Sequence, residues 1–211
     1  MEVVSLGHIG IEAAAFDAAA VLGRGGIILF PTDTLYGLGV DSFSDDAVAK
    51  IYAIKGRDEK KPIHAIVADL EMASEYGHID DTVRRLTERL PKGKVTFIVK
   101  KRSDVFGGIA KGIDTFGFRI PDNDFCIAAA RAFGKPFTAT SANIAGQKPE
   151  RTLVAVLAQL DANGEKIDIA FDAGELAESP SSSVVDVSTG ELRVLREGVV
   201  PTSEIKRLSI L

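Results

Sequence analysis

Apolar and polar positions follow two different periods at the start of this chain. Small and apolar residues recur at helical spacing through IEAAAFDAAAVLGRGG, residues 11–26, and the apolar run GIILFP follows up to Pro31. The glycine pair that ends the helical pattern is a stop signal, and the proline closes the strand pattern. We therefore predict a helix followed by a short buried strand.

The rest of the chain repeats this exchange of helical and strand patterns. Further helices are predicted over residues 45–54, 69–76, 80–90 and 123–133 and from about residue 152. Strands are predicted at residues 63–68, 95–101, 115–120, 137–140, 167–172, 183–188 and 191–197. The turn STGE makes the last two strands a hairpin. Helices interleaved with single apolar strands indicate an α/β domain with a mixed, twisted sheet rather than a regular βαβ array.

Composition indicates one globular domain over residues 1–211, with 45% apolar and 26% charged residues and no repeat or linker. Cys126 is the only cysteine and does not group with the three histidines at metal-ligand spacing. This pattern predicts a reducing, cytoplasmic setting and no metal ligands among the protein side chains. The acidic N-terminus and the lack of an apolar run near the ~20 residues that span a bilayer predict neither secretion nor membrane insertion.

Basic residues are concentrated in two segments, although the formal net charge is −5. Residues 50–61 hold five bases and two acids, and residues 84–102 hold eight bases and one acid. A solvated helix face explains such a cluster as well as an anion site does. The first cluster falls in a predicted loop, which favours an anion site there, while the second stays open between the two interpretations.

Four predicted loops carry small polar or cationic side chains directly after a helix or strand, where α/β sheets build their sites. Their sequences are PTDTLYG, KGRDEKK, GIDTFGFR and TSANIAG. They supply hydroxyl, amide and cationic groups from Thr32, Thr34, Thr115, Ser141, Asn143, Lys55, Arg57, Lys61 and Arg119. None of them holds a histidine beside a serine or cysteine, a close carboxylate pair, or a Walker-type glycine loop. Such a site suits the binding and transfer of phosphoryl or carboxylate groups through positioning and electrostatic stabilisation.

Five segments together resemble a known family. PTDTLYGLGVD, IYAIKGR, GIDTFGFRIP, TSANIAG and VLREG are similar, in the same order, to the signature segments of the single-domain YrdC-like threonylcarbamoyl-AMP synthases. The resemblance implies an open, twisted α/β sheet with flanking helices and a concave basic face. It also implies that L-threonine, bicarbonate and ATP with Mg²⁺ give threonylcarbamoyl-AMP and pyrophosphate, without a tightly bound cofactor. A partner enzyme would then transfer the threonylcarbamoyl group to the adenosine beside the tRNA anticodon.

The same resemblance implies roles for individual residues. The catalytic tetrad would be Lys55, Arg57, Ser141 and Asn143. L-Threonine would contact Thr32, Thr34, Arg119, Ser141 and Ser182, with Arg119 on its carboxylate. ATP would contact Lys55, Arg57, Lys61, Thr115, Asn143 and Arg196.

Several of these roles have a simpler alternative in the sequence. Thr32 and Thr34 could cap a turn after the first strand. Because three serines are consecutive, Ser181 or Ser183 could take the role given to Ser182. His64 and His78 are interpreted as surface or loop histidines, and Tyr36 as a packing residue.

Two departures from the family pattern concern prolines. Asp58 follows the Lys-x-Arg arginine where the family has proline, and PKGK stands where the family has Pro-Gly-Pro. Neither change removes a predicted contact side chain.

Two other functions compete with synthesis of the adenylate. The first is a module of the same fold that binds double-stranded RNA, tRNA or a ribosome precursor without chemistry, for which a suitable spread of cations is sufficient. The second is a carbamoyl-adenylate domain of the hydrogenase-maturation type, which normally accompanies acylphosphatase-like and zinc-finger segments that this sequence does not show.

Overall fold

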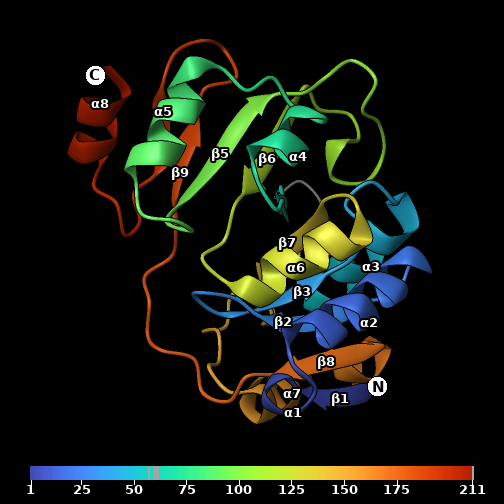
Figure 1. The fold of residues 1–211 in the computed structure, drawn as a ribbon. Helices are drawn as coiled ribbons and strands as arrows, with labels where there is room; N and C mark the ends of the chain where they lie inside the picture. The colour runs from blue at the N-terminus through green and yellow to red at the C-terminus, as the bar shows by residue number, and fades with distance from the viewer. Residues whose placement is uncertain (57, 59–61, 211) are drawn as a thin grey trace.

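The computed structural model describes residues 1–56, 58 and 62–210. Within these residues ten strands form one sheet, drawn in Figure 1. From one edge to the other the strands are β1 (Glu2–Ser5), β8 (Ile169–Asp172), β2 (Ile28–Pro31), β3 (Tyr36–Gly39), β7 (Phe137–Ser141), β4 (His64–Ile66), β6 (Thr115–Arg119), β5 (Val95–Lys100), β9 (Ser183–Asp186) and β10 (Arg193–Arg196). The pairs β1–β8, β8–β2, β4–β6 and β5–β9 are parallel, and the remaining pairs are antiparallel. The predicted mixed α/β sheet is confirmed, whereas the extent of one domain over 1–211 stays a prediction.

Helices flank this sheet. They are α1 (Leu6–Ile9), α2 (Ile11–Gly23), α3 (Asp45–Lys55), α4 (Leu70–Ser74), α5 (Asp81–Arg89), α6 (Asp124–Phe133), α7 (Leu153–Leu160) and α8 (Thr202–Ile210), with 3-10 turns η1 (Gly108–Ala110) and η2 (Asp161–Lys166). Most of the predicted helices begin at side-chain caps, because Ser44, Asp80, Asn123 and Thr152 each accept a hydrogen bond from the first turn of α3, α5, α6 and α7. Helix α2 begins after Gly10 without such a cap. No helix in the described part of the chain is long and apolar enough to cross a membrane.

Four elements were not predicted from the sequence: β1, α1, β3 and α8. Strand β3 reads YGLG, and glycine is a poor strand former. Its glycines are needed because the Phe30 ring of β2 lies against them: a Cβ atom at Gly37 or Gly39 would stand 3.1 or 2.9 Å from that ring. The Phe30 ring therefore fills the space that side chains at these two positions of β3 would occupy.

Packing leaves part of one sheet face open. Helices α5 and α8 pack together beside β5, β6 and β9 (Figure 1), around a core that includes Phe116 and Phe118. Because successive strand residues point to opposite faces, Thr115, Gly117 and Arg119 of the same strand point away from this core. The face that carries them is the one that forms a cleft.

Candidate functional site

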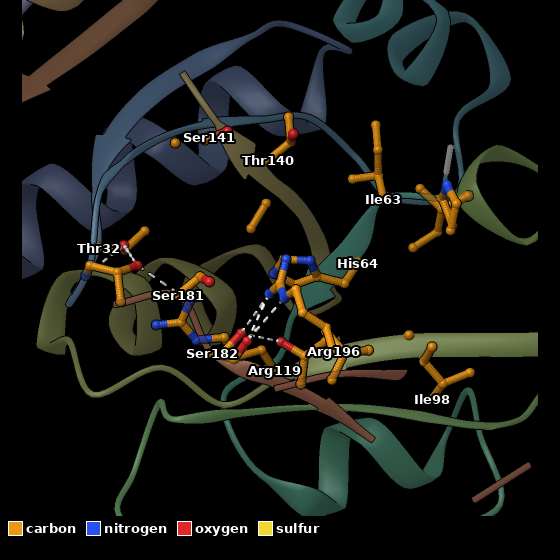
Figure 2. A pocket seen from close by; sticks show the side chains of 18 of the residues that line it. Thr32, Ile63, His64, Ile98, Arg119, Thr140, Ser141, Ser181, Ser182 and Arg196 are labelled. Carbon is orange, nitrogen blue, oxygen red and sulfur yellow. Dashed lines mark hydrogen bonds between the residues drawn. The ribbon is translucent and has the colours of Figure 1, made fainter. Parts of the chain in front are cut away.

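A cleft of about 350 Å³ runs across the open face of the sheet (Figure 2). Its floor consists of paired residues on neighbouring strands from β3 to β10, half of them small: Gly37, Ser141, Ala139, His64, Gly117, Ile98, Val184 and Arg196. Apolar side chains form part of the wall, namely Pro62, Ile63, Ile109 and Ile113. The cleft therefore combines an apolar wall with polar groups at both ends.

The turn between β2 and β3 brings two hydroxyls to the cleft. The Thr32 hydroxyl donates to the Leu35 carbonyl oxygen at 2.7 Å and accepts from the Thr34 and Leu35 backbone N–H groups, each at 3.1 Å. The two threonine hydroxyls are 3.0 Å apart, and both residues are buried. Thr32 therefore has the turn-capping function that the sequence left open, and Thr34 is the one that faces Arg119, whose Nη1 lies 3.5 Å from its hydroxyl.

Arg119 forms an ion pair that the sequence reasoning missed. Its Nη2 donates to the Asp33 carboxylate, and the side chains of both residues are only 7% exposed. Lys94 Nζ lies 3.4 Å from the other oxygen of Asp33. In the sequence, an acid between two threonines of a predicted anion site offered no reason to select it, because a carboxylate there would repel the ligand.

The serine segment and Arg196 complete this end of the cleft. Arg196 donates through Nη2 and Nε to the Ser182 carbonyl oxygen, at 2.8 and 3.3 Å, and the Ser182 hydroxyl lies 2.8 Å from that of Thr96. The pKa of Arg196 is lowered from its ordinary value, first by partial burial and then by the positive charge of Arg119. Two guanidinium groups that repel each other favour an anion between them.

The three consecutive serines have different surroundings. Ser183 donates to the Val200 carbonyl oxygen at 2.7 Å and accepts from the backbone N–H groups of Gly198 and Val200. Its hydroxyl is thus used within the fold, whereas Ser181 and Ser182 both line the cleft.

At the other end of the cleft, the structure brings three members of the predicted tetrad together. Lys55, the last residue of α3, is 1% exposed and donates to the Ser141 carbonyl oxygen and to both oxygens of Asn143, the latter at 2.9 and 3.1 Å. The Ser141 hydroxyl donates to the Asn143 side-chain oxygen at 2.5 Å. The Asn143 amide donates to Ile144 and Gln147 carbonyl oxygens. In this state Lys55 and Asn143 hold the loop after β7, and their contacts with substrate stay a prediction.

Other predicted residues are placed as follows. Thr115 lines the cleft at the start of β6. Arg57 and Lys61 lie outside the described residues. His78 is an exposed loop residue, as expected.

His64 was interpreted wrongly, because it lies on β4 in the middle of the cleft floor rather than in a surface loop. Its neighbours explain its place on the cleft floor: Ala139, its register partner on β7, has a small side chain, and Gly117 on β6, which lies beside it, has none. A strand residue that faces a cleft cannot be told from one that faces solvent until the neighbouring strands are known.

Two other groups are unsuited to acid-base or nucleophilic chemistry. The Tyr36 hydroxyl donates to the Gly174 carbonyl oxygen at 2.8 Å, and burial is the main reason that its pKa is raised to about 12. Burial also raises the pKa of the Cys126 thiol. Tyr36 therefore packs, as expected, and neither group ionises near neutral pH.

Metal ligation by the protein has no candidate in the described part of the chain. No three His, Cys, Asp or Glu side chains there gather in a group that could hold an ion. The described residues that line the cleft include no carboxylate.

These features define an α/β protein whose open sheet face holds a cleft lined by hydroxyl and guanidinium donors. Comparison with known proteins identifies the family. Residues 20–198 match the model of the family Sua5/YciO/YrdC, described as "Telomere recombination". The chain therefore belongs to the Sua5/YciO/YrdC family.

Named relatives agree with this assignment. The chain is 30% identical over 184 residues to a putative threonylcarbamoyl-AMP synthase of Methanocaldococcus jannaschii, a match that covers 87% of this chain and 85% of the relative. It is 31% identical over 192 residues to the threonylcarbamoyl-AMP synthase of Pyrococcus abyssi, covering 90% of this chain but 56% of that protein.

A solved structure shows the same fold. The crystal structure of P. abyssi Sua5 in complex with L-threonine matches with a TM-score of 0.86 at 27% identity, over 98% of this chain and 60% of the other. The chain thus spans little more than half the length of the P. abyssi relatives.

Proposed function

We propose that this protein is an L-threonylcarbamoyladenylate synthase, a nucleotidyltransferase that converts L-threonine, bicarbonate and ATP to threonylcarbamoyl-AMP and pyrophosphate. One observation carries the proposal: a single cleft has buried Arg119 and Thr34 at one end and Ser141, with Lys55 and Asn143 behind it, at the other. Relatives named threonylcarbamoyl-AMP synthase and a Sua5 structure that contains L-threonine support it.

The reaction has two bond-forming steps. The amine of threonine, once it has lost a proton, combines with bicarbonate to give a carbamate, and water leaves. A carbamate oxygen then forms a bond to the α-phosphorus of ATP, and the bond to the β-phosphate oxygen breaks to release pyrophosphate. Both reactants of the second step are anions, and two unit charges of like sign ~4 Å apart repel by about 4 kcal/mol at an effective dielectric constant near 20.

The residues of the cleft suit this problem by position and charge. Arg119 would bind the threonine carboxylate, with Thr34 and Ser182 beside the amino acid. Ser141 would hold the intermediate, and Arg57, Lys61, Thr115 and Arg196 would contact the nucleotide. Because Lys55 donates to the loop that carries Ser141 and Asn143, it would position those groups even before it exchanges a partner for a phosphate oxygen.

Magnesium would enter as part of the ATP substrate. The described lining of the cleft offers hydroxyl and cationic groups rather than carboxylates. Mg²⁺ bound by substrate phosphates and water fits such a site, because the ion retains much of its hydration shell. It would neutralise part of the triphosphate charge during the attack.

The decisive experiment is direct synthesis. Purified protein incubated with ATP, Mg²⁺, bicarbonate and labelled L-threonine should form labelled threonylcarbamoyl-AMP together with pyrophosphate. Failure to form the adenylate, combined with tight binding of double-stranded RNA or tRNA, would replace this proposal by an RNA-binding module. That alternative is not favoured, because it leaves the convergence of hydroxyl, amide and guanidinium groups in one cleft unexplained.

Amino-acid selection gives a first prediction. A pocket that hydrogen-bonds the threonine hydroxyl should reject valine more strongly than serine, because valine leaves buried polar groups unpaired while serine lacks only a methyl group. We expect kcat/KM for serine to fall by about 10- to 200-fold and for valine by more than that. Competition assays with the three amino acids measure the ratios, and equal use of valine and threonine would contradict a hydrogen-bonding pocket.

The serine segment gives a second prediction. Ser183→Ala should lower the free energy of unfolding by about 1 to 3 kcal/mol, because it removes an acceptor and donor used within the fold, while kcat/KM stays near the parental value. Ser182→Ala should do the reverse, with a threonine KM raised about tenfold and the smaller loss of stability, because the fold loses only the hydrogen bond between the Ser182 and Thr96 hydroxyls. Urea unfolding and steady-state kinetics separate the two, and a Ser183→Ala variant with the larger kinetic defect would reverse the assignment.

Two further aspects stay predictions. A downstream enzyme would transfer the threonylcarbamoyl group to tRNA, and direct contact of this protein with RNA is not required for the adenylate to form. The predicted cytoplasmic setting fits a substrate set of ATP, threonine and bicarbonate.

A further inference from the structure

Three charged side chains from separate parts of the chain meet at the carboxylate end of the cleft. Asp33 lies in the turn between β2 and β3, Arg119 ends β6, and Lys94 directly precedes β5. Asp33 is bonded to both cations, to Arg119 through one oxygen and to Lys94 through the other at 3.4 Å. One buried carboxylate is therefore shared by two cations.

The sharing of Asp33 between Arg119 and Lys94 decides the net charge that a ligand meets at this end of the cleft. An isolated pair of Asp33 and Arg119 would be neutral, and a ligand carboxylate would then gain little from the guanidinium while being repelled by Asp33. With Lys94 the group carries one net positive charge. Arg196 stands at the same end of the cleft. The lysine therefore adds to the attraction that the two arginines exert on an external carboxylate, because it offsets the charge of Asp33.

Arg119 also retains donor capacity. Asp33 takes one hydrogen bond from Nη2, Thr34 lies at 3.5 Å from Nη1, and Nε is buried without an acceptor. Nε is too buried to reach a ligand, but Nη1 and Nη2 keep N–H groups that can bind a second, planar anion. Asp33 thus orients Arg119 from one side without using all of its hydrogen-bond donors.

The backbone around Lys94 is built for this contact. Gly93 has φ +71°, and a Cβ atom there would stand 2.4 Å from the Asp33 carboxylate and 2.7 Å from the backbone nitrogen of Asp122. The Lys94 carbonyl oxygen accepts from the Ser183 N–H at 3.0 Å, which ties the segment to the serine wall of the cleft. The positive φ of Gly93 and the backbone hydrogen bond to Ser183 therefore place this lysine beside Asp33 rather than in solvent.

We propose that Lys94 is a positioning residue which, by sharing Asp33 with Arg119, makes this end of the cleft selective for an amino acid with a free carboxylate. Lys94 acts through Asp33 and does not itself touch the substrate. The inference rests on the proposed synthase function and specifies how its amino-acid site recognises the carboxylate charge of the substrate.

The kinetic test replaces the lysine. In Lys94→Met, Asp33 pairs with Arg119 alone, and KM for L-threonine should rise about tenfold while kcat and KM for ATP stay within about twofold of the parent. Lys94→Arg should restore most of the threonine affinity. Lys92→Met, which removes the same charge from an exposed position in the same segment, should leave KM unchanged. Thermal unfolding checks that each variant folds, and Lys94→Gln serves if the methionine variant does not.

Two further measurements distinguish a charge-sharing role from a merely structural one. Calorimetric binding should show that the parent prefers L-threonine to L-threoninol, which lacks the carboxylate, and that Lys94→Met loses about tenfold of this preference. In an Asp33→Asn background, Lys94→Met should have no further effect on threonine affinity, because the residue through which it acts is already neutral.

The outcomes are separable. An active parent whose Lys94→Met variant keeps the parental threonine KM overturns the inference alone, and so does an equal rise in KM for ATP. A Lys94 effect that persists in the Asp33→Asn background overturns the proposed sharing. A parent that neither forms threonylcarbamoyl-AMP nor binds threonine overturns the synthase proposal, and this inference with it.

Discussion

Replacing Arg119 with alanine is expected to lower kcat/KM for L-threonine by at least about 100-fold, which corresponds to ~2.7 kcal/mol of transition-state stabilisation. Arg119 is 5% exposed, lines the cleft and is the proposed partner of the threonine carboxylate. Without it, that carboxylate would face Asp33 with only Lys94 for compensation. Steady-state kinetics with threonine as the varied substrate measures the loss.

Two controls separate recognition from folding in this variant. Arg119→Lys keeps the charge but not the planar fork of donors, so it should recover only part of the activity. Arg119→Met combined with Asp33→Asn also removes the buried carboxylate, which would otherwise keep only Lys94 as a partner, and should recover stability but not activity. Parental kcat/KM in Arg119→Ala would exclude a direct role in threonine binding.

The second large effect is expected from Lys55→Met. The substitution leaves the Ser141 carbonyl oxygen and both oxygens of Asn143 without the ammonium donor that lies among them, at a site that is 1% exposed. We expect the free energy of unfolding to fall by about 2 to 4 kcal/mol, because three buried oxygens each lose a hydrogen bond from a charged donor. Adenylate synthesis should fall by at least about 100-fold, because the loop carrying Ser141 and Asn143 loses its anchor.

Measurement of this prediction needs urea unfolding beside the synthase assay. Lys50→Met is the matched control on the same helix: Lys50 is exposed, its Nζ donates only at the surface to the Gly25 carbonyl oxygen at 2.8 Å, and its loss should cost less than about 1 kcal/mol with parental activity. Lys55→Arg should fail to rescue, since a planar fork does not fit a cage of three oxygens around a compact ammonium. A stable and active Lys55→Met protein would remove both the structural and the catalytic role.

Local signals determined most of the helices. The caps Ser44, Asp80 and Asn123 stand directly before apolar patterns of helical period, and α3, α5 and α6 begin one residue later. Capping joins residues only three positions apart, so these boundaries are visible in the sequence. In contrast, β3 was hidden because its two glycines are explained by a ring on another strand.

The sequence predicted which residues belong to the site but not which of them contact one another. Hydroxyl, amide and cationic residues on four loops indicated an anion site, and the structure brings Thr32, Thr34, Thr115, Arg119, Ser141, Asn143 and Lys55 to or beside one cleft. The sequence did not show that Lys55 would be surrounded by carbonyl oxygens, or that Ser183 would be used within the fold while Ser182 faces the cleft. Those outcomes depend on which strands become neighbours.

Charge sharing and the position of His64 were decided by tertiary structure alone. Asp33 and Arg119 are 86 residues apart in the sequence, and His64 faces the cleft only because β4 pairs in one particular register with β6 and β7. A shift of one residue in that register would turn every side chain of the strand to the other face. Local patterns therefore determined most of the helices and strand segments and the chemical groups available to the site. Sheet order and register decided which of those groups come into contact. Strands that pair through hydrogen bonds are distant in the sequence, so the residues near a strand in the chain give little indication of its partners.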